Sequence, residues 1–314
     1  MGSPSELVVR LAMGAAGLPE ELRRRHAAYL ASAQREDGGF AGRRGSSDLY
    51  YTSFALRGLA MLGDLNETIA ARAAAFLSPR LASPASLPPA DFVSLVTSSL
   101  QVELATGRDL FSEAGRERQR TVVDFFAPFR RDDGAYAKTE RGASSTYQTF
   151  LVVLCKQLVG APLDDAERMI QLVRSRQRED GGFVELDALR ASGTNPTAAA
   201  IGLLRALDGL DQPIATAAAG FLAAMRTDEG GLRAHARIPF ADLLSTFTGL
   251  LTLNDMGMTD QIDAEAARAF VRSLEEGAGG FRAGAWDSAP DAEYTFYGLG
   301  TWALLVESPN AVDG

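Results

Sequence analysis

Apolar positions recur with helical spacing along the whole chain, in pairs of segments that differ in how far the apolar face extends. The first segment of a pair, such as 23–33 or 166–176, is apolar on one face. The second, such as 54–62 or 297–305, is apolar nearly all round. This contrast predicts an amphipathic outer helix followed by a buried inner helix in each pair.

A glycine turn separates the two helices of a pair and recurs at a constant interval. Residues 34–40 and 177–183 are identical, and weaker copies end at Tyr136, Leu232 and Phe281. The terminal apolar residues of these copies fall at 40, 136, 183, 232 and 281, so the period is about 48 residues. The first gap is two periods, which places a degenerate second repeat at about 76–104. We therefore predict six helical hairpins in one domain, 1–314.

An aspartate begins most of the inner helices, and in all but one of these a threonine follows four residues later, the exception being Leu95 after Asp91. The aspartates are Asp48, Asp91, Asp242 and Asp291. An aspartate before a helix accepts backbone N–H bonds and faces the positive end of the helix dipole, so each is predicted to be an N-cap. Six such hairpins form either a closed ring or an open solenoid, and the periodicity alone does not choose between them.

The Asp-Gly-Gly-Phe turn followed by the Asp-x-x-x-Thr helix start resembles the repeats of protein prenyltransferase β subunits, most closely those of the Rab-type geranylgeranyltransferase. Terpenoid cyclases share these repeats, and the resemblance covers nearly the whole chain. It implies an all-α fold, an α/α toroid of six helical-hairpin repeats. In that family six inner helices surround an apolar cavity that holds an isoprenoid chain.

The zinc ligands of the family are not retained. The resemblance places them in an Asp-x-Cys at the start of the fifth inner helix and in a histidine before the threonine of the sixth. Here the first motif is Asp242-Leu243-Leu244, and Tyr294 replaces the histidine. Leucine and phenol are poor zinc ligands, so we predict no metal site. Asp242 is kept as a catalytic candidate, with helix capping as the alternative role.

In the family, basic side chains in the loop ahead of the fifth inner helix bind the diphosphate. That loop contains Arg233, His235 and Arg237, offset by about one residue. Guanidinium and imidazolium groups suit a diphosphate, with Mg²⁺ as the cation that would accompany such a substrate. The alternative is a solvated surface loop.

Glu293 resembles the acid of a second reaction type. In protonation-initiated terpene cyclases, the middle aspartate of Asp-x-Asp-Asp-Thr protonates an alkene, and the segment 291–295 has Glu293 in that place. A carboxylic acid in an apolar cavity keeps its proton more strongly. The alternative for Glu293 is an exposed carboxylate in the first turn of a helix.

The residue two positions before each recurring threonine position is predicted to face the cavity. Most of these residues are apolar or aromatic, which suits a hydrophobic ligand. The catalytic candidates are Glu293 and Asp242. The residues expected to bind substrate are Arg233, His235, Arg237, Tyr50, Tyr147, Asn195, Leu244, Tyr294, Phe247 and Trp302.

The composition excludes several function classes. With 31 Lys and Arg against 40 Asp and Glu, the net charge of −9 argues against a nucleic-acid partner. One cysteine, Cys155, and two histidines exclude a cysteine-rich zinc cluster or a three-histidine site. No apolar run approaches the ~20 residues of a membrane span. Glu6 and Arg10 interrupt the apolar start, which makes a poor signal peptide, so we expect a cytoplasmic protein.

Three functions fit these observations. The first is an isoprenoid-binding protein that processes a prenyl diphosphate without zinc. The second is a protonation-initiated terpene cyclase with Glu293 as the acid. The third is a non-catalytic toroid that binds a lipid or a protein. Conventional protein prenylation would also need a partner subunit, because in that family an α subunit packs on the barrel.

Overall fold

The computed structural model describes residues 4–306, and within them the chain is helical with only isolated β-bridges. The inner helices are α3 (Leu49–Leu62), α5 (Pro89–Thr106), α8 (Thr146–Leu158), α10 (Thr194–Ala206), α12 (Leu243–Asp255) and α14 (Ala292–Leu305). The outer helices are α2 (Glu20–Ser32), α4 (Glu67–Ala82), α7 (Arg118–Phe126), α9 (Ala166–Ser175), α11 (Gln212–Ala224) and α13 (Ala264–Ser273). The remaining elements are α1 (Pro4–Ala16), α6 (Leu110–Glu113), η1 (Pro84–Ser86), η2 (Ala127–Phe129) and η3 (Thr259–Gln261). No helix in this range is both long and apolar enough to cross a bilayer.

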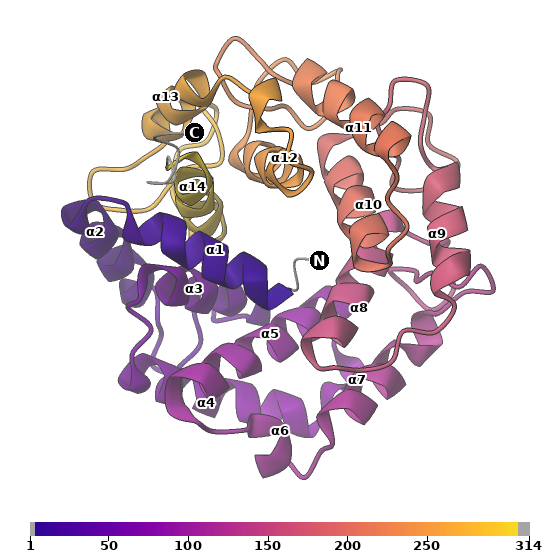
Figure 1. The fold of residues 1–314 in the computed structure, drawn as a ribbon. Coiled ribbons are helices and arrows are strands. Elements are labelled where there is room, and N and C mark those ends of the chain that lie inside the picture. The colour runs from indigo at the N-terminus through magenta and orange to yellow at the C-terminus, as the bar shows by residue number, and fades with distance from the viewer. Residues whose placement is uncertain (1–3, 307–314) are drawn as a thin grey trace, which may run out of the picture.

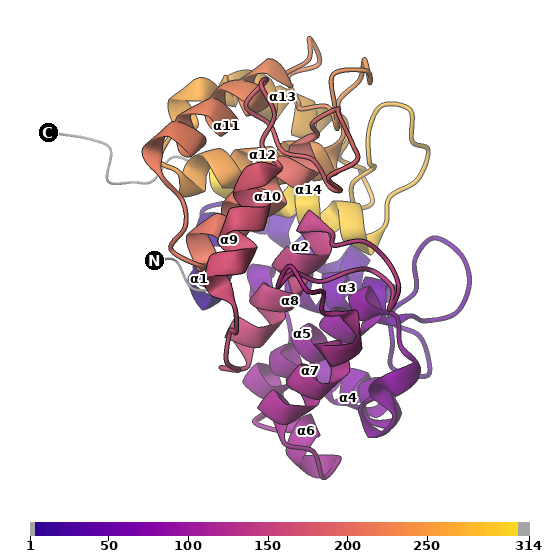
Figure 2. The same ribbon diagram turned by 90° about the vertical axis from the view of Figure 1, so that its right-hand side faces the viewer.

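The inner helices form a closed ring. Each packs against the next in chain order, and α14 returns to pack against α3 (Figure 1). The outer helices surround them with the long loops at one end (Figure 2). The predicted all-α toroid is confirmed, and the contact between the first and last inner helices excludes an open solenoid.

The conserved threonine explains the repeat, because its hydroxyl joins the glycine turn to the inner helix. The Oγ1 of Thr197 accepts the backbone N–H of Phe183 at 2.9 Å and donates to the carbonyl of Gly193 at 2.7 Å. Thr52 bonds Phe40 N and the carbonyl of Asp48 in the same way. The aromatic residue of the turn is thereby fixed beneath the inner helices, where it is fully buried.

The glycine turns also join one repeat to the next. Gly38 and Gly181 have φ angles of 88° and 84°, which favour glycine. A Cβ at Gly38 would lie 1.9 Å from the carbonyl oxygen of Arg72 on α4, and one at Gly181 would lie 2.3 Å from that of Ala217 on α11. Each turn therefore sits against the outer helix of the following repeat.

The second repeat departs from the pattern at its turn. Helix α5 begins at Pro89 with Pro88 as its N-cap residue, and η1 occupies the loop before it. The prediction that Asp91 caps this helix is wrong, because Asp91 lies within its first turn. The prolines start the helix earlier, since a fixed φ suits the first helical position.

Polar contacts, one of them fully buried, join the first repeat to the last. The Nδ1 atom of His26 accepts the N–H of Gly280 at 2.9 Å, and its Nε2 atom lies 3.2 Å from Glu275 Oε1. The Arg43 guanidinium forms a bidentate ion pair with Asp287 and also contacts Asp291. These contacts hold the first repeat against the last where the ring closes.

Helix α1 was not predicted, and it lies across the end of the ring opposite the long loops (Figures 1 and 2). It contacts α14, α3 and α8. Gly14 allows the closest approach, since a Cβ there would lie 2.2 Å from the carbonyl oxygen of Ala303. Arg10 bonds Asn254 and Asp255 at the C-terminal end of α12. The helix therefore covers the ring where the inner helices end.

Candidate active site

The inward face of the ring keeps partly accessible side chains. Each inner helix is covered by a neighbour on either side and an outer helix behind, so accessible side chains in its middle face the interior. On α5, α8 and α12 these positions lie two and five residues after the conserved threonine position. They are Thr97, Leu100, Leu151, Leu154, Thr248 and Leu251. We call the inward-facing positions of the inner helices the inner wall.

Glu293 lies on the inner wall in the first turn of α14. Its carboxylate accepts a 2.6 Å hydrogen bond from the hydroxyl of Tyr50 on α3. Burial raises the pKa of Glu293 to about 6, and nearby Asp291 acts in the same direction, while the Tyr50 hydrogen bond opposes the shift. The position predicted from sequence is therefore a partly buried acid that faces the interior.

Tyrosines surround this carboxyl group. Burial raises the pKa of Tyr50, Tyr294 and Tyr297, and the negative charge of Glu293 adds to each shift. Burial also raises the pKa of Tyr147, although 43% of its surface stays accessible. Tyr147 is thus the most accessible of these four tyrosines.

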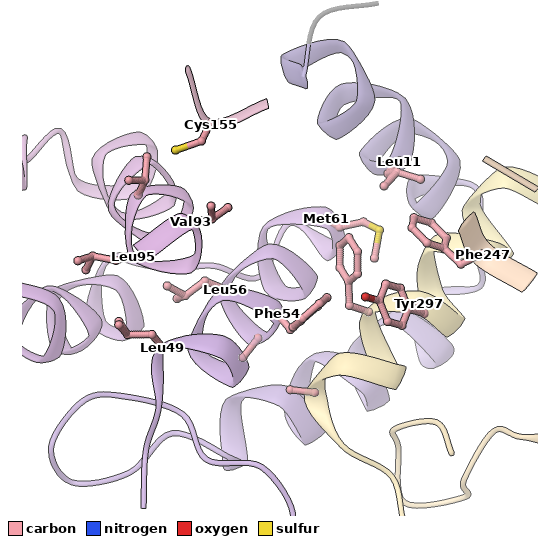
Figure 3. Close-up of a cluster of buried hydrophobic side chains, with 14 of the residues drawn as sticks. Leu11, Leu49, Phe54, Leu56, Met61, Val93, Leu95, Cys155, Phe247 and Tyr297 are labelled. Atoms are coloured by element: carbon pink, nitrogen blue, oxygen red, sulfur yellow. The ribbon is translucent and has the colours of Figure 1, made fainter. Parts of the chain in front are cut away.

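Aromatic rings from three inner helices continue the inner wall below Glu293. Phe54 of α3 lies 5.6 Å from Phe296 and 5.3 Å from Tyr297, between ring centroids. Phe247 of α12 lies 5.4 Å from Tyr297. Figure 3 shows Phe54, Phe247 and Tyr297 gathered beside Leu11 of α1. Aromatic faces of this kind stabilise positive charge in an apolar setting.

The other predicted residues lie at different heights along the inner helices. Asn195 Oδ1 accepts the hydroxyl of Thr248 at 2.7 Å across α10 and α12. Leu244 is half-buried on α12. Trp302 lies under Arg272 of the outer helix α13, and it is nine residues beyond Glu293 on α14. At 1.5 Å per residue that is about 13 Å, so the structure does not bring Trp302 to the acid.

The loop that was predicted to bind a diphosphate lies outside the inner wall. Arg233 donates to the carbonyl oxygen of Ala224 at 3.3 Å, and its own carbonyl accepts from Thr194. His235 Nδ1 accepts the backbone N–H of Arg237 at 3.2 Å. Arg237 is exposed, and within residues 4–306 its guanidinium has no ion-pair or hydrogen-bond partner. One unpaired cation in this loop is thus available to an anion.

The comparisons with known proteins decide the family. The family model "Prenyltransferase alpha-alpha toroid domain" matches residues 11–83 and 99–313. The chain belongs to this family. The match breaks at 84–98, around the degenerate second repeat.

Solved structures with a similar fold share little sequence identity with the chain. A chain of Candida albicans protein geranylgeranyltransferase-I complexed with GGPP is 13% identical, with a TM-score of 0.73 over 90% of this chain and 91% of that one. The type II terpene cyclase MstE from Scytonema, in complex with geranylgeranyl dihydroxybenzoate, is 14% identical, with a TM-score of 0.59 over 96% and 98%. A protein from Actinoplanes is 15% identical, with a TM-score of 0.58 over 91% and 98%. No curated protein matches the chain by sequence.

The residues at the position where the resemblance places the zinc ligands are Asp242, Leu244 and Tyr294. The Asp242 carboxylate accepts from the backbone N–H and the hydroxyl of Ser245, at 2.7 and 2.8 Å, as the N-cap of α12. Leu244 offers no donor atom, and burial keeps Tyr294 in its neutral phenol form. Within residues 4–306 no three His, Cys, Asp or Glu side chains group as metal ligands.

Sequence reasoning missed two polar residues of the inner wall. Arg57 of α3 and Gln101 of α5 both face the interior beside α1. The available signal was a lone arginine within the apolar segment 54–62, which interrupts an otherwise buried helix.

Proposed function

We propose that this protein binds an isoprenoid chain inside the toroid and that Glu293 protonates an alkene of that chain. The observation that carries the proposal is the Glu293 carboxyl group on an aromatic inner wall, with a pKa raised to about 6. A carboxylic acid of this kind is a stronger proton donor than water and remains protonated in part near neutral pH.

The chemistry follows from the neighbours of the acid. Transfer of the Glu293 proton forms a C–H bond at one alkene carbon and leaves a carbocation at the other. Tyr50 donates to the carboxylate that remains, which stabilises its negative charge. A second alkene of the same chain closes a ring by attacking the carbocation. Loss of a proton from the cyclised cation to the Glu293 carboxylate ends the reaction and restores the acid.

The aromatic wall supports this chemistry in two ways. The rings of Phe54 and Tyr297, which keep 7% and 8% of their surface accessible, would stabilise the cation. Together with Phe247 they also present apolar surface that fits a hydrocarbon. The terpene-cyclase relative is matched over 98% of its own length, so a single barrel of this size is compatible with that class.

A second candidate is the processing of a prenyl diphosphate at the loop that contains Arg237. Its support is the exposed guanidinium of Arg237, which has no partner within residues 4–306. Mg²⁺ would accompany such a substrate. Zinc-dependent protein prenylation is not proposed, because Leu244 and Tyr294 replace the expected ligands.

The test is incubation with geranylgeranyl diphosphate, with and without zinc, followed by solvent extraction and mass spectrometry. The proposal expects a cyclised isomer of the same mass with its diphosphate retained, formed without zinc and lost in Glu293→Gln. Release of free diphosphate that depends on Arg237 would favour the second candidate. Binding without any product in wild type would identify a non-catalytic isoprenoid carrier and refute the role of Glu293.

A further inference from the structure

One charged side chain on the inner wall stands alone. Arg57 is on α3, seven residues beyond Tyr50, and no ion pair or hydrogen bond to it occurs within residues 4–306. Its guanidinium carbon lies 4.1 Å from the ring centroid of Phe296 and 5.5 Å from that of Phe54. Residues at the equivalent position of the other inner helices carry no charge or polar side-chain group. They are Leu100, Leu154, Gly202, Leu251 and Gly300.

This isolation is costly for the protein alone. Burial lowers the pKa of Arg57, and the nearby phenols of Tyr297, Tyr147 and Tyr50 only partly offset the loss of hydration. A guanidinium nevertheless keeps its charge in proteins. The faces of Phe296 and Phe54 attract the guanidinium, but a buried charge without an anionic partner still destabilises a fold.

A second polar side chain faces the same point. A cavity of about 30 Å³ is lined by Arg57, Gln101 and Phe296 together with Leu7, Val8 and Leu11 of α1. Gln101 is 7% exposed, and within residues 4–306 its amide has no hydrogen-bond partner. The amide offers two N–H donors beside the five of the guanidinium. Two donor groups from two helices, neither with a protein acceptor within residues 4–306, therefore line the same cavity.

We propose that Arg57 and Gln101 bind the anionic headgroup of the ligand, a diphosphate or a carboxylate, at the end of the interior that α1 covers. The inference rests on the proposed function for the nature of the tail. Arg57 is seven residues from Tyr50, which bonds Glu293, so the two sites are separated by about 10 Å along α3. The ligand would place its anion against α1 and an alkene at Glu293.

This arrangement separates the two charges that the reaction needs to keep apart. The headgroup would neutralise Arg57 before positive charge develops on the chain beside Phe54 and Tyr297. It would also set the register of the chain, and hence which alkene meets Glu293. The exposed loop at Arg237 has no part in this site.

The experiment compares three ligands that share one hydrocarbon tail and differ in their headgroup: geranylgeranyl diphosphate, geranylgeranoic acid and geranylgeraniol. Calorimetry measures their affinity for wild type, Arg57→Met, Arg57→Lys and the control Arg24→Met, which changes an exposed arginine of the outer helix α2. A charge-assisted hydrogen bond corresponds to about tenfold to hundredfold in affinity. Wild type and Arg24→Met should prefer the anions by that factor, Arg57→Met should lose the preference, and Arg57→Lys should keep part of it. Whichever anion binds more tightly identifies the headgroup.

Two further readouts separate the possible failures. Unliganded Arg57→Met should unfold at the same or a higher temperature than wild type, because it removes an uncompensated charge; a lower temperature would assign Arg57 a structural role and overturn the inference. Equal binding of the anions by wild type and Arg57→Met would overturn the inference but leave the proposed function standing.

Hexadecanoic acid and hexadecanol test the opposite outcome, in which the anion site exists but the protein does not bind isoprenoids. Arg57-dependent preference for that acid, without isoprenoid binding, would retain the anion site and refute the proposed function. No binding of any amphiphile would refute both.

Discussion

Replacing Glu293 with glutamine should change how the stability of the protein depends on pH. The folded-state pKa of Glu293 is about 6, against 4.5 in its unperturbed state. Because the folded state holds the proton more tightly, this group contributes stability that is fully present below about pH 4.5. That contribution is lost as the pH rises through 6. This difference in pKa corresponds to about 2 kcal/mol.

Glutamine removes this titration but keeps an oxygen that accepts from Tyr50. The free energy of unfolding of Glu293→Gln, minus that of wild type, should therefore increase by about 2 kcal/mol between pH 4 and pH 7.5. Urea unfolding at half-unit steps of pH measures both proteins. All other titrating groups are shared, so their contributions cancel in the difference.

Tyr50→Phe provides a second variant with a defined direction. It removes the hydrogen bond that stabilises the charged carboxylate, so the pKa of Glu293 should increase by about one further unit. The midpoint of the Glu293 titration, measured as the stability difference between Tyr50→Phe and Tyr50→Phe/Glu293→Gln, should move to higher pH. If instead the difference between wild type and Glu293→Gln is the same at every pH, the carboxyl group is solvated and the argument for a proton donor is refuted.

Three further predictions concern the ring itself. Burial and the charge of Arg25 lower the pKa of His26 to about 4. The contribution of His26 to folding stability should therefore fall by about 3 kcal/mol as the pH drops from 6.5 to 4. The free energy of unfolding of His26→Gln in urea, minus that of wild type, should rise by this amount over the same range. Gly14→Leu should lift α1 from Ala303 and cost about 1–3 kcal/mol, measured by thermal unfolding, and an unchanged melting temperature would contradict the close packing of α1. Thr197→Val leaves the buried N–H of a glycine turn without an acceptor and should cost about 1–3 kcal/mol, whereas Thr197→Ser should retain most of the stability.

The repeat pattern allowed the fold to be predicted from the sequence. The turn ending at Phe183 and the threonine at Thr197 form a local unit in which the hydrogen bonds lie within fourteen residues. A local pattern of this kind is visible in the sequence whenever it recurs. Helix α1 was missed because it belongs to no repeat, and its packing on Ala303 joins opposite ends of the chain.

The candidate acid, Glu293, could be predicted from sequence for the same reason. The residues that surround it could not. Glu293 occupies a fixed register in the sixth repeat, so the sequence placed it on the inner face. Its hydrogen bond to Tyr50 spans 243 residues, and no local pattern records it. The position of Trp302 was likewise not predicted, because its contact with Arg272 on the outer helix α13 joins two different elements.

By itself, the sequence determined the helical hairpins, their number, their turns and the family, because these depend on periodicity and on hydrogen bonds between near neighbours. Only the tertiary structure decided that the ring closes, that α1 covers one end, and that Arg57 lies beside Gln101 with no ion-pair or hydrogen-bond partner in the described range 4–306. Those features arise where residues from different repeats meet. Desolvation and unsatisfied donors depend on every atom around a group, and that environment exists only after the ring has closed.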